Sequence, residues 1–157
     1  MNLLLLNVFL AASWAALVGS FTLPSLLLGF GIGYLALWAV RPLFGESRYF
    51  ERVWRFLRLA ALFIYELFVS SLRVVWDVIT PAHISKPGII AMPLDARSEG
   101  EVLLVANLIS LTPGSLSLDL SPDGKTLYVH AMFVDDPDAL RKELKSGMER
   151  RVLEALE

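Results

Sequence analysis

The sequence predicts a membrane α-helical hairpin and an amphipathic third helix, followed by a small cytoplasmic α+β domain with the order β-α-β-β-α. Three observations support this fold class. Positions 1–40 carry no charged side chain, positions 41–79 combine an arginine run with a polar stripe, and the chain after position 88 alternates like strands and turns. We therefore expect a membrane region at 1–80 and a second domain at 88–157.

The charge-free stretch ends at Arg41, the first of five arginines that continue through Arg48, Arg52, Arg55 and Arg58. This pattern is typical of a membrane-inserted segment whose end faces the cytoplasm. A secretory signal would need a basic start before a shorter apolar region. Because nothing basic precedes this long apolar stretch, we expect the N-terminus to stay on the mature protein.

Turn residues interrupt the charge-free stretch at Gly19-Ser20-Phe21-Thr22-Leu23-Pro24-Ser25. They leave two apolar segments, 3–18 and 26–40, which we predict to be the arms of a helical hairpin. At 1.5 Å per residue each arm reaches roughly 25 Å, a little less than the ~30 Å of bilayer hydrocarbon. We therefore expect the bilayer to thin locally, or other proteins to shelter the arms.

Three glycines in the second arm, Gly29, Gly31 and Gly33, alternate with bulky apolar residues. Small residues let another backbone approach a membrane helix closely. We interpret the three glycines as small residues that permit close packing, and as lacking the four-residue spacing of the familiar dimer motif. Helix packing is the resulting prediction.

A third apolar segment lies within a helix expected at about 48–79 and contains Glu66, Ser70, Arg73 and Asp77. Their three- and four-residue spacing, continued upstream by two of the arginines, predicts one polar stripe. We favour a helix that lies at the membrane interface, because a single crossing would put the arginine run and the second domain on opposite sides. A third crossing is the alternative.

Glu66, Arg73 and Asp77 are candidate functional residues, because ionisable groups within membrane segments are functional candidates by default. One hypothesis places them on an ion route. The other, which we prefer because interfacial helices normally carry such stripes, is that they pair with one another or with partner subunits. The sequence itself suggests no partner for this stripe elsewhere in the chain.

The second domain starts with a short continuous apolar run, 89–94, which predicts a buried strand. Ser98 and Glu101 have the spacing of a capping box before a helix at 102–111. That helix is predicted to end before Thr112-Pro113-Gly114, because proline and glycine disfavour its continuation.

A β-hairpin is predicted next, with alternating segments at 115–120 and 125–134 and the turn Ser121-Pro122-Asp123-Gly124 between them. The leucines of the first segment and the apolar residues of the second are expected on one apolar face. Asp136 before Pro137 predicts the start of a final helix. The apolar side of that helix is expected to carry Leu140, Leu144, Met148 and Val152.

The composition excludes several classes of function. The chain has no cysteine and a net charge of -2, which excludes thiolate metal sites and gives no basic field suited to nucleic acid. No spacing pairs a nucleophile with a base or assembles metal ligands, so we expect no enzyme, no cofactor and no metal. Asp135, Asp136 and Asp138 are predicted to favour a helix start rather than to bind a hard cation.

Two runs carry a resemblance to a known family. They are Asn107-Leu108-Ile109-Ser110-Leu111-Thr112-Pro113-Gly114-Ser115 and Asp123-Gly124-Lys125-Thr126-Leu127-Tyr128-Val129-His130-Ala131, the second continuing to Asp135-Asp136. The chain resembles, over essentially its whole length, the E-type subunit of the multisubunit Na+/H+ cation/proton antiporter of bacteria (Mrp or Mnh type). One departure is Ser115, where threonine is expected; both side chains carry a hydroxyl.

The resemblance implies a multi-pass chain of the bacterial inner (cell) membrane, with its C-terminal domain in the cytoplasm. It implies a non-catalytic accessory subunit that supports assembly of a complex exchanging sodium for protons, with a part in the sodium route as a further expectation. The expected partners are the other membrane subunits and the lipid bilayer, with Na+ and H+ carried at the level of the complex. A candidate docking turn, which also ends a helix, comprises Ser110, Thr112, Pro113 and Gly114.

The alternative function is a free-standing membrane-anchored binding module. It predicts a stable lone protein, and the short arms argue mildly against it. An enzyme would need a polar pocket around His130 and Thr112, for which the sequence offers no pattern.

Overall fold

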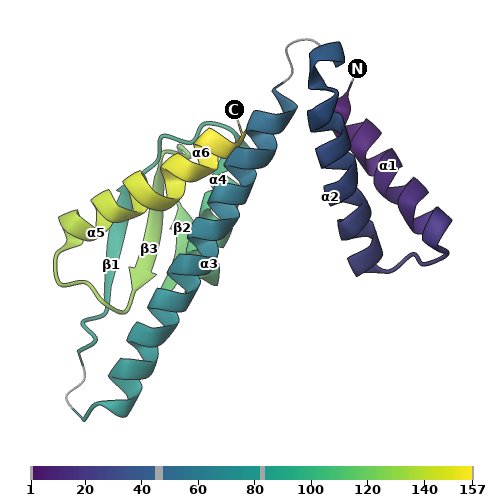
Figure 1. Cartoon of the computed structure of the whole chain (residues 1–157). Helices are drawn as coiled ribbons and strands as arrows, with labels where there is room; N and C mark the ends of the chain where they lie inside the picture. Colours follow the sequence, from purple (N-terminus) through teal and green to yellow (C-terminus); the bar gives the residue numbers. More distant parts are fainter. Residues whose placement is uncertain (1, 45–47, 82–83, 157) are drawn as a thin grey trace. The chain divides into compact units, whose positions relative to one another are not determined.

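The chain divides into two compact units, Met1–Val53 and Trp54–Glu157 (Figure 1). The computed structural model describes residues 2–44, 48–81 and 84–156. The helices of the membrane region predicted from the sequence are α1 (Leu3–Val18), α2 (Leu23–Ala39), the short 3-10 helix η1 (Arg41–Phe44) and α3 (Tyr49–Ile79). The remaining elements are β1 (Gly88–Pro93), α4 (Glu99–Leu111), β2 (Ser115–Leu120), β3 (Thr126–Ala131), α5 (Pro137–Leu144), the π-helical turn η2 (Lys145–Glu149) and α6 (Arg150–Leu156).

Residues at the helix ends explain where α1 and α2 start and stop. The Asn2 side chain accepts a hydrogen bond from a backbone N–H of the first turn of α1. Gly19, at φ +69°, ends α1 in the left-handed conformation that glycine adopts without strain. Pro24 lies in the first turn of α2, where its missing N–H costs no helical hydrogen bond. The second helix therefore begins at Leu23, before the predicted start at 26.

α1 and α2 pack against each other through small side chains. Their buried positions recur at every fourth residue, and these are Leu3, Asn7, Ala11 and Ala15 in α1 and Ser25, Gly29, Gly33 and Leu37 in α2. A Cβ on Gly29 would lie 2.9 Å from the Ala11 carbonyl oxygen, so the close approach requires glycine. Our interpretation of the glycines is therefore wrong in one respect: Gly29 and Gly33 do have the four-residue spacing, while Gly31 is exposed.

The second unit contains a three-stranded antiparallel sheet in the order β1-β3-β2. Its strands and helices follow one another in the predicted order. Helices cover one face of this sheet, and the core between them contains Ile90, Met92, Leu127 and Val129 from the strands, Val105 and Ile109 from α4, and Met148 and Val152 from η2 and α6. The capping box predicted at Ser98 and Glu101 is present at the start of α4.

The β1 strand differs from its prediction, because it is buried on one side alone. Ile90 is 2% exposed whereas its neighbour Ile89 is 64% exposed. Helices cover a single face of the sheet, so the continuous apolar run does not indicate burial on both sides.

A bulge in β2 changes which leucines share a face. Leu116 pairs with His130 and Leu120 pairs with Leu127, while the register shifts between Ser117 and Asp119. Directly paired residues lie on the same side of a sheet, so Leu116 lies on the open face and Leu120 on the face of the buried Leu127. The single apolar face predicted for this hairpin is therefore wrong.

The final helical run is interrupted by a π-helical turn, which the sequence did not predict. Met148 and Val152 belong to the core, and Leu140 and Leu144 pack against it, so the predicted apolar side is confirmed. Asp136 starts the run by accepting hydrogen bonds from the N–H groups of the first turn of α5.

Candidate functional site

One side of α3 packs against the α+β domain, and this is the side that carries the predicted polar stripe. Leu59 belongs to the domain core, and Phe63 packs against that core. The same side continues at steps of three and four residues. We call it the inner face of α3, and it comprises Leu59, Phe63, Glu66, Ser70, Arg73 and Asp77. The expectation that the stripe has no partner in the chain is therefore wrong.

Asp77 connects the end of α3 to the segment before β1. Its side chain is buried, and Oδ1 accepts hydrogen bonds from the N–H groups of Ile84 at 2.6 Å and Ser85 at 2.9 Å. A carboxylate that accepts from two backbone donors forms strong, charge-assisted hydrogen bonds. The arrangement gives Asp77 a definite role in ordering this connection.

Arg73 and Glu66 also have their neighbours in the α+β domain. The Arg73 guanidinium carbon lies 5.7 Å from the centroid of the Phe133 ring, within the range of a cation–π contact. Glu66 is half-buried, and the charges near it include Glu143 of α5 as well as Arg73. The three candidate residues therefore lie along one helix face, with Glu66 and Arg73 near the domain and Asp77 bonded to the segment that leads into it.

The candidate docking turn is held by hydrogen bonds inside the domain. The Thr112 hydroxyl donates to the Leu108 carbonyl at 2.9 Å, and the Ser110 hydroxyl accepts from the Ser117 N–H at 3.0 Å. Gly114 has φ +87°, and its carbonyl accepts from the Met132 N–H at 2.8 Å. The turn thus joins the end of α4 to β2 and to the residue that follows β3.

The aspartates before α5 differ in their contacts. Asp136 caps α5, as predicted. Asp135 lies 2.7 Å from the Lys86 ammonium, which lowers the pKa of Asp135 and raises that of Lys86. Asp138 pairs with Arg141 one turn later in α5. Among the described residues, no group of three or more His, Cys, Asp or Glu side chains could hold a metal ion.

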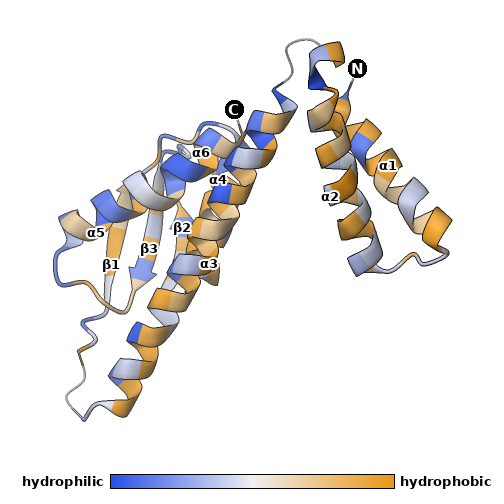
Figure 2. Ribbon diagram, viewed as in Figure 1, coloured by the Kyte–Doolittle hydropathy of each residue, from blue (hydrophilic) through white to orange (hydrophobic). Residues whose placement is uncertain are grey.

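The opposite side of α3 is apolar and exposed. Figure 2 shows hydrophobic residues along much of this helix. We call it the outer face, and it comprises Leu57, Ile64, Phe68, Leu72, Val75 and Ile79. Phe68 is 63% exposed and Ile79 is 66% exposed. By length and composition alone, α3 is long and apolar enough to cross a membrane, and α1 and α2 are shorter apolar helices.

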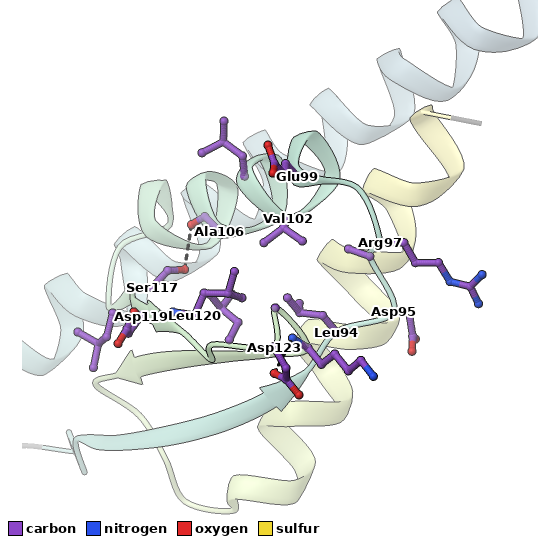
Figure 3. Close-up of a pocket in the computed structure, with 16 residues that line it drawn as sticks. Leu94, Asp95, Arg97, Glu99, Val102, Ala106, Ser117, Asp119, Leu120 and Asp123 are labelled. Atoms are coloured by element: carbon purple, nitrogen blue, oxygen red, sulfur yellow. Dashed lines mark hydrogen bonds between the residues drawn. The ribbon is translucent and has the colours of Figure 1, made fainter.

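A groove of about 900 Å³ lies between α4 and β2 (Figure 3). Its lining combines apolar side chains with charges of both signs, among them Leu103, Leu118, Leu120, Asp95, Glu99, Asp119, Arg97 and Lys125. At one end, the Ser117 hydroxyl donates to the Ala106 carbonyl at 2.9 Å. This groove was not predicted, because the β2 bulge that redirects its leucines has no clear sequence signal.

The buried polar residues Glu149 and Asn7 were also missed. Glu149 is buried in η2, and its Oε1 accepts from the N–H groups of Asp95 at 2.5 Å and Ala96 at 3.1 Å. Asn7 is buried between α1 and α2, and its Nδ2 donates to the Tyr49 hydroxyl at 2.6 Å. The signal for Asn7 was available: it is an amide in an apolar stretch, at the same four-residue interval as the small residues of α1.

Known proteins resemble this chain over nearly its full length. It is 34% identical over 151 residues to the E-type subunit of the Na(+)/H(+) antiporter of Alkalihalophilus pseudofirmus, covering 96% of each chain. It is 35% identical over 153 residues to the E1-type subunit of the Na(+)/H(+) antiporter of Staphylococcus haemolyticus, covering 96% of this chain and 95% of that one.

Solved structures give a consistent result. A chain in the Mrp complex from Dietzia sp. is similar at a TM-score of 0.50 and 33% identity, over 66% of this chain and 96% of that chain. A chain of the membrane-bound sulfane sulfur reductase, an archaeal respiratory membrane complex, shares the fold at a TM-score of 0.52 and 24% identity, over 85% of this chain and 84% of that one. Residues 7–155 match the model of the MNHE family, described as Na+/H+ ion antiporter subunit, and the chain belongs to this family.

Proposed function

We propose that this chain is a non-catalytic accessory subunit of a Na+/H+ antiporter complex in the bacterial cell membrane. In this proposal α1 and α2 cross the membrane as a hairpin, and the α+β domain lies on the cytoplasmic face and supports assembly. Family membership supports a place in the antiporter. The similarity to a chain of the Dietzia Mrp complex supports a multisubunit setting.

The observation that carries the proposal is the apolar surface left on α1 and α2 after they have packed together. Their small residues are used between the two helices, whereas large side chains such as Phe9, Leu17 and Leu28 are exposed on the other sides. Exposed apolar surface of this kind indicates a bilayer or a membrane partner. A shallow apolar hollow of about 590 Å³ along α2, over Gly31, would accept a side chain of another subunit.

Arg73 and Asp77 act in assembly in this proposal, because they hold α3 in place. The subunit supports the sodium route, but the route does not run through these two residues or through Glu66. Their contacts support this role: Asp77 accepts hydrogen bonds from the segment before β1, and Arg73 lies over the Phe133 ring of the α+β domain. The turn at Ser110–Gly114 likewise acts as a structural connection, with partner docking as a secondary role.

The test is a mild-detergent pull-down of the tagged chain from its native membrane, followed by mass spectrometry. We expect large antiporter-like subunits to accompany the chain. Gly31→Leu fills the hollow on α2 and should lose them, while Gly100→Leu is the matched control, because a Cβ on either glycine meets nothing within 4 Å. Recovery of the wild-type chain alone would overturn the proposal.

A membrane-anchored binding module is the second candidate, and the groove between α4 and β2 favours it. A volume of about 900 Å³ with an apolar lining and several charges is within the range of small-molecule sites. This candidate predicts that the chain purifies alone as a stable particle. Fluorescence-based ligand screening of that particle, with Leu118→Trp as a variant that fills the groove, would then test it.

A further inference from the structure

The inner face of α3 contacts the α+β domain along most of the helix. Leu59 lies in the domain core, Arg73 lies against Phe133, and Asp77 bonds the segment that leads to β1. The distance from Leu59 to Asp77 along the helix is about 27 Å, close to the thickness of bilayer hydrocarbon. A helix that crossed the bilayer over this length would carry the domain into hydrocarbon with it.

The domain is unsuited to that environment. Its surface carries charged side chains on α5 and α6, including Lys142, Glu143 and Arg150. Removing such charges from water costs on the order of several kcal/mol each. The third-crossing alternative therefore conflicts with the contacts of the inner face.

The outer face has the opposite character. Between Trp54 and Ile79, the charged residues of α3 other than Arg58 lie on or beside the inner face, as their helical spacing requires. The outer face extends about 33 Å from Leu57 to Ile79 without a charged member. Trp54, Tyr65 and Trp76 are exposed beside it, and tryptophan and tyrosine favour the headgroup level of membranes.

We propose that α3 lies in the plane of the membrane surface, with its outer face bound to an anionic phospholipid bilayer. Arg58, which is exposed beside the outer face near the N-terminal end of α3, is complementary in charge to anionic headgroups. The chain also tethers the helix there: α3 begins ten residues after the end of α2, a separation of at most about 35 Å. The inference rests on the proposed insertion of α1 and α2.

Because the chain has no cysteine, single cysteines can carry nitroxide labels at outer-face positions. The full-length chain in nanodiscs of phosphatidylcholine and phosphatidylglycerol would be labelled in turn at Leu57, Ile64, Phe68, Leu72 and Ile79. Collision rates with oxygen and with a nickel chelate then report the depth of each label. Lys142→Cys on exposed α5 provides the water reference, and Phe9→Cys on α1 reports insertion of the hairpin.

An in-plane helix places all five labels at one shallow depth, about 5–10 Å below the headgroups. A depth that peaks at Phe68 and falls toward both ends would mean a crossing, and exclusion of both reagents would mean coverage by protein; either result overturns the inference. If the outer-face labels are exposed to water while the Phe9 label is deep, the in-plane position of α3 is overturned and the proposed hairpin stands. If the Phe9 label is shallow, the proposed hairpin is overturned as well. Replacing phosphatidylglycerol with phosphatidylcholine should make Leu57 shallower, and an unchanged depth would overturn the role of anionic lipid.

Discussion

The Asn7 side chain of α1 lies directly against Gly33 of α2. A Cβ on Gly33 would overlap the Asn7 Oδ1, which has no hydrogen-bond partner among the described residues. The same amide donates to the Tyr49 hydroxyl, so it links the packing of the two helices to the start of α3. Displacing Asn7 should therefore disturb both contacts.

Gly33→Ala is expected to destabilise the first unit by about 1–3 kcal/mol, because the added methyl group forces Asn7 to move in a tightly packed contact. Thermal unfolding of the full-length chain in detergent would measure this loss. Gly31→Ala is the matched control, since a Cβ there meets nothing within 4 Å. In the double variant Asn7→Ala/Gly33→Ala the added methyl group no longer meets the Asn7 amide, so the stability lost to this clash should be recovered. If the double variant instead loses the sum of the stabilities lost by the two single variants, the clash is not the cause.

Leu59→Ala should destabilise the α+β domain by about 2–5 kcal/mol, because Leu59 is buried in the domain core and its truncation leaves a cavity. Leu57→Ala removes the same atoms from an exposed site on the outer face and should cost less than about 0.5 kcal/mol. Limited proteolysis of the domain in membranes would compare the two variants. Equal effects would mean that α3 is not part of the domain core.

The Glu101 carboxylate makes the start of α4 sensitive to acid. It accepts hydrogen bonds from the N–H groups of Arg97 at 2.8 Å and Ser98 at 3.0 Å, and these bonds hold its pKa below the ordinary value. A carboxyl group whose pKa is lower in the folded state stabilises that state above its unfolded pKa of about 4.3, and the gain is lost as pH falls through the folded pKa.

The melting temperature of Glu101→Gln should therefore lie below that of the wild-type domain at neutral pH, and the difference should shrink as pH falls below about 4.3. Circular dichroism across this pH range would measure the difference. A difference that stayed constant with pH would show that the charge of Glu101 does not contribute.

Local signals in the sequence were enough to predict most elements. The Ser98 and Glu101 capping box, the Gly19 break and the Asp136-Pro137 start each act within one turn of chain, and the structure contains all three. Such short-range chemistry depends little on the rest of the fold.

What failed depends on contacts between distant residues. The stripe on α3 predicts a polar face, but nothing local specifies that this face meets the α+β domain instead of water or a partner. The β2 bulge and the burial of Glu149 likewise follow from tertiary packing, which overrides patterns of alternation. The four-residue spacing of Gly29 and Gly33 was visible in the sequence and was misinterpreted.

The role of Asp77 can be separated from ion transport by one pair of variants. Asp77→Ala leaves the N–H groups of Ile84 and Ser85 without their acceptor, which should cost about 1–3 kcal/mol and lower the yield of assembled complex. Asp77→Asn keeps an acceptor of similar shape and should assemble better than the alanine variant.

Transport is then measured per assembled complex, as sodium-dependent proton movement in vesicles. If Asp77 acts in folding and assembly, each assembled Asp77→Asn complex should transport at the wild-type rate. The loss of charge would then change how many complexes assemble, but not how fast each one transports. A loss of transport in fully assembled Asp77→Asn complexes would instead place this carboxylate on the ion route. Glu66→Gln provides the comparison on the same inner face, where Glu143 lies nearby: removing a negative charge there relieves repulsion, so assembly should be unchanged or improved.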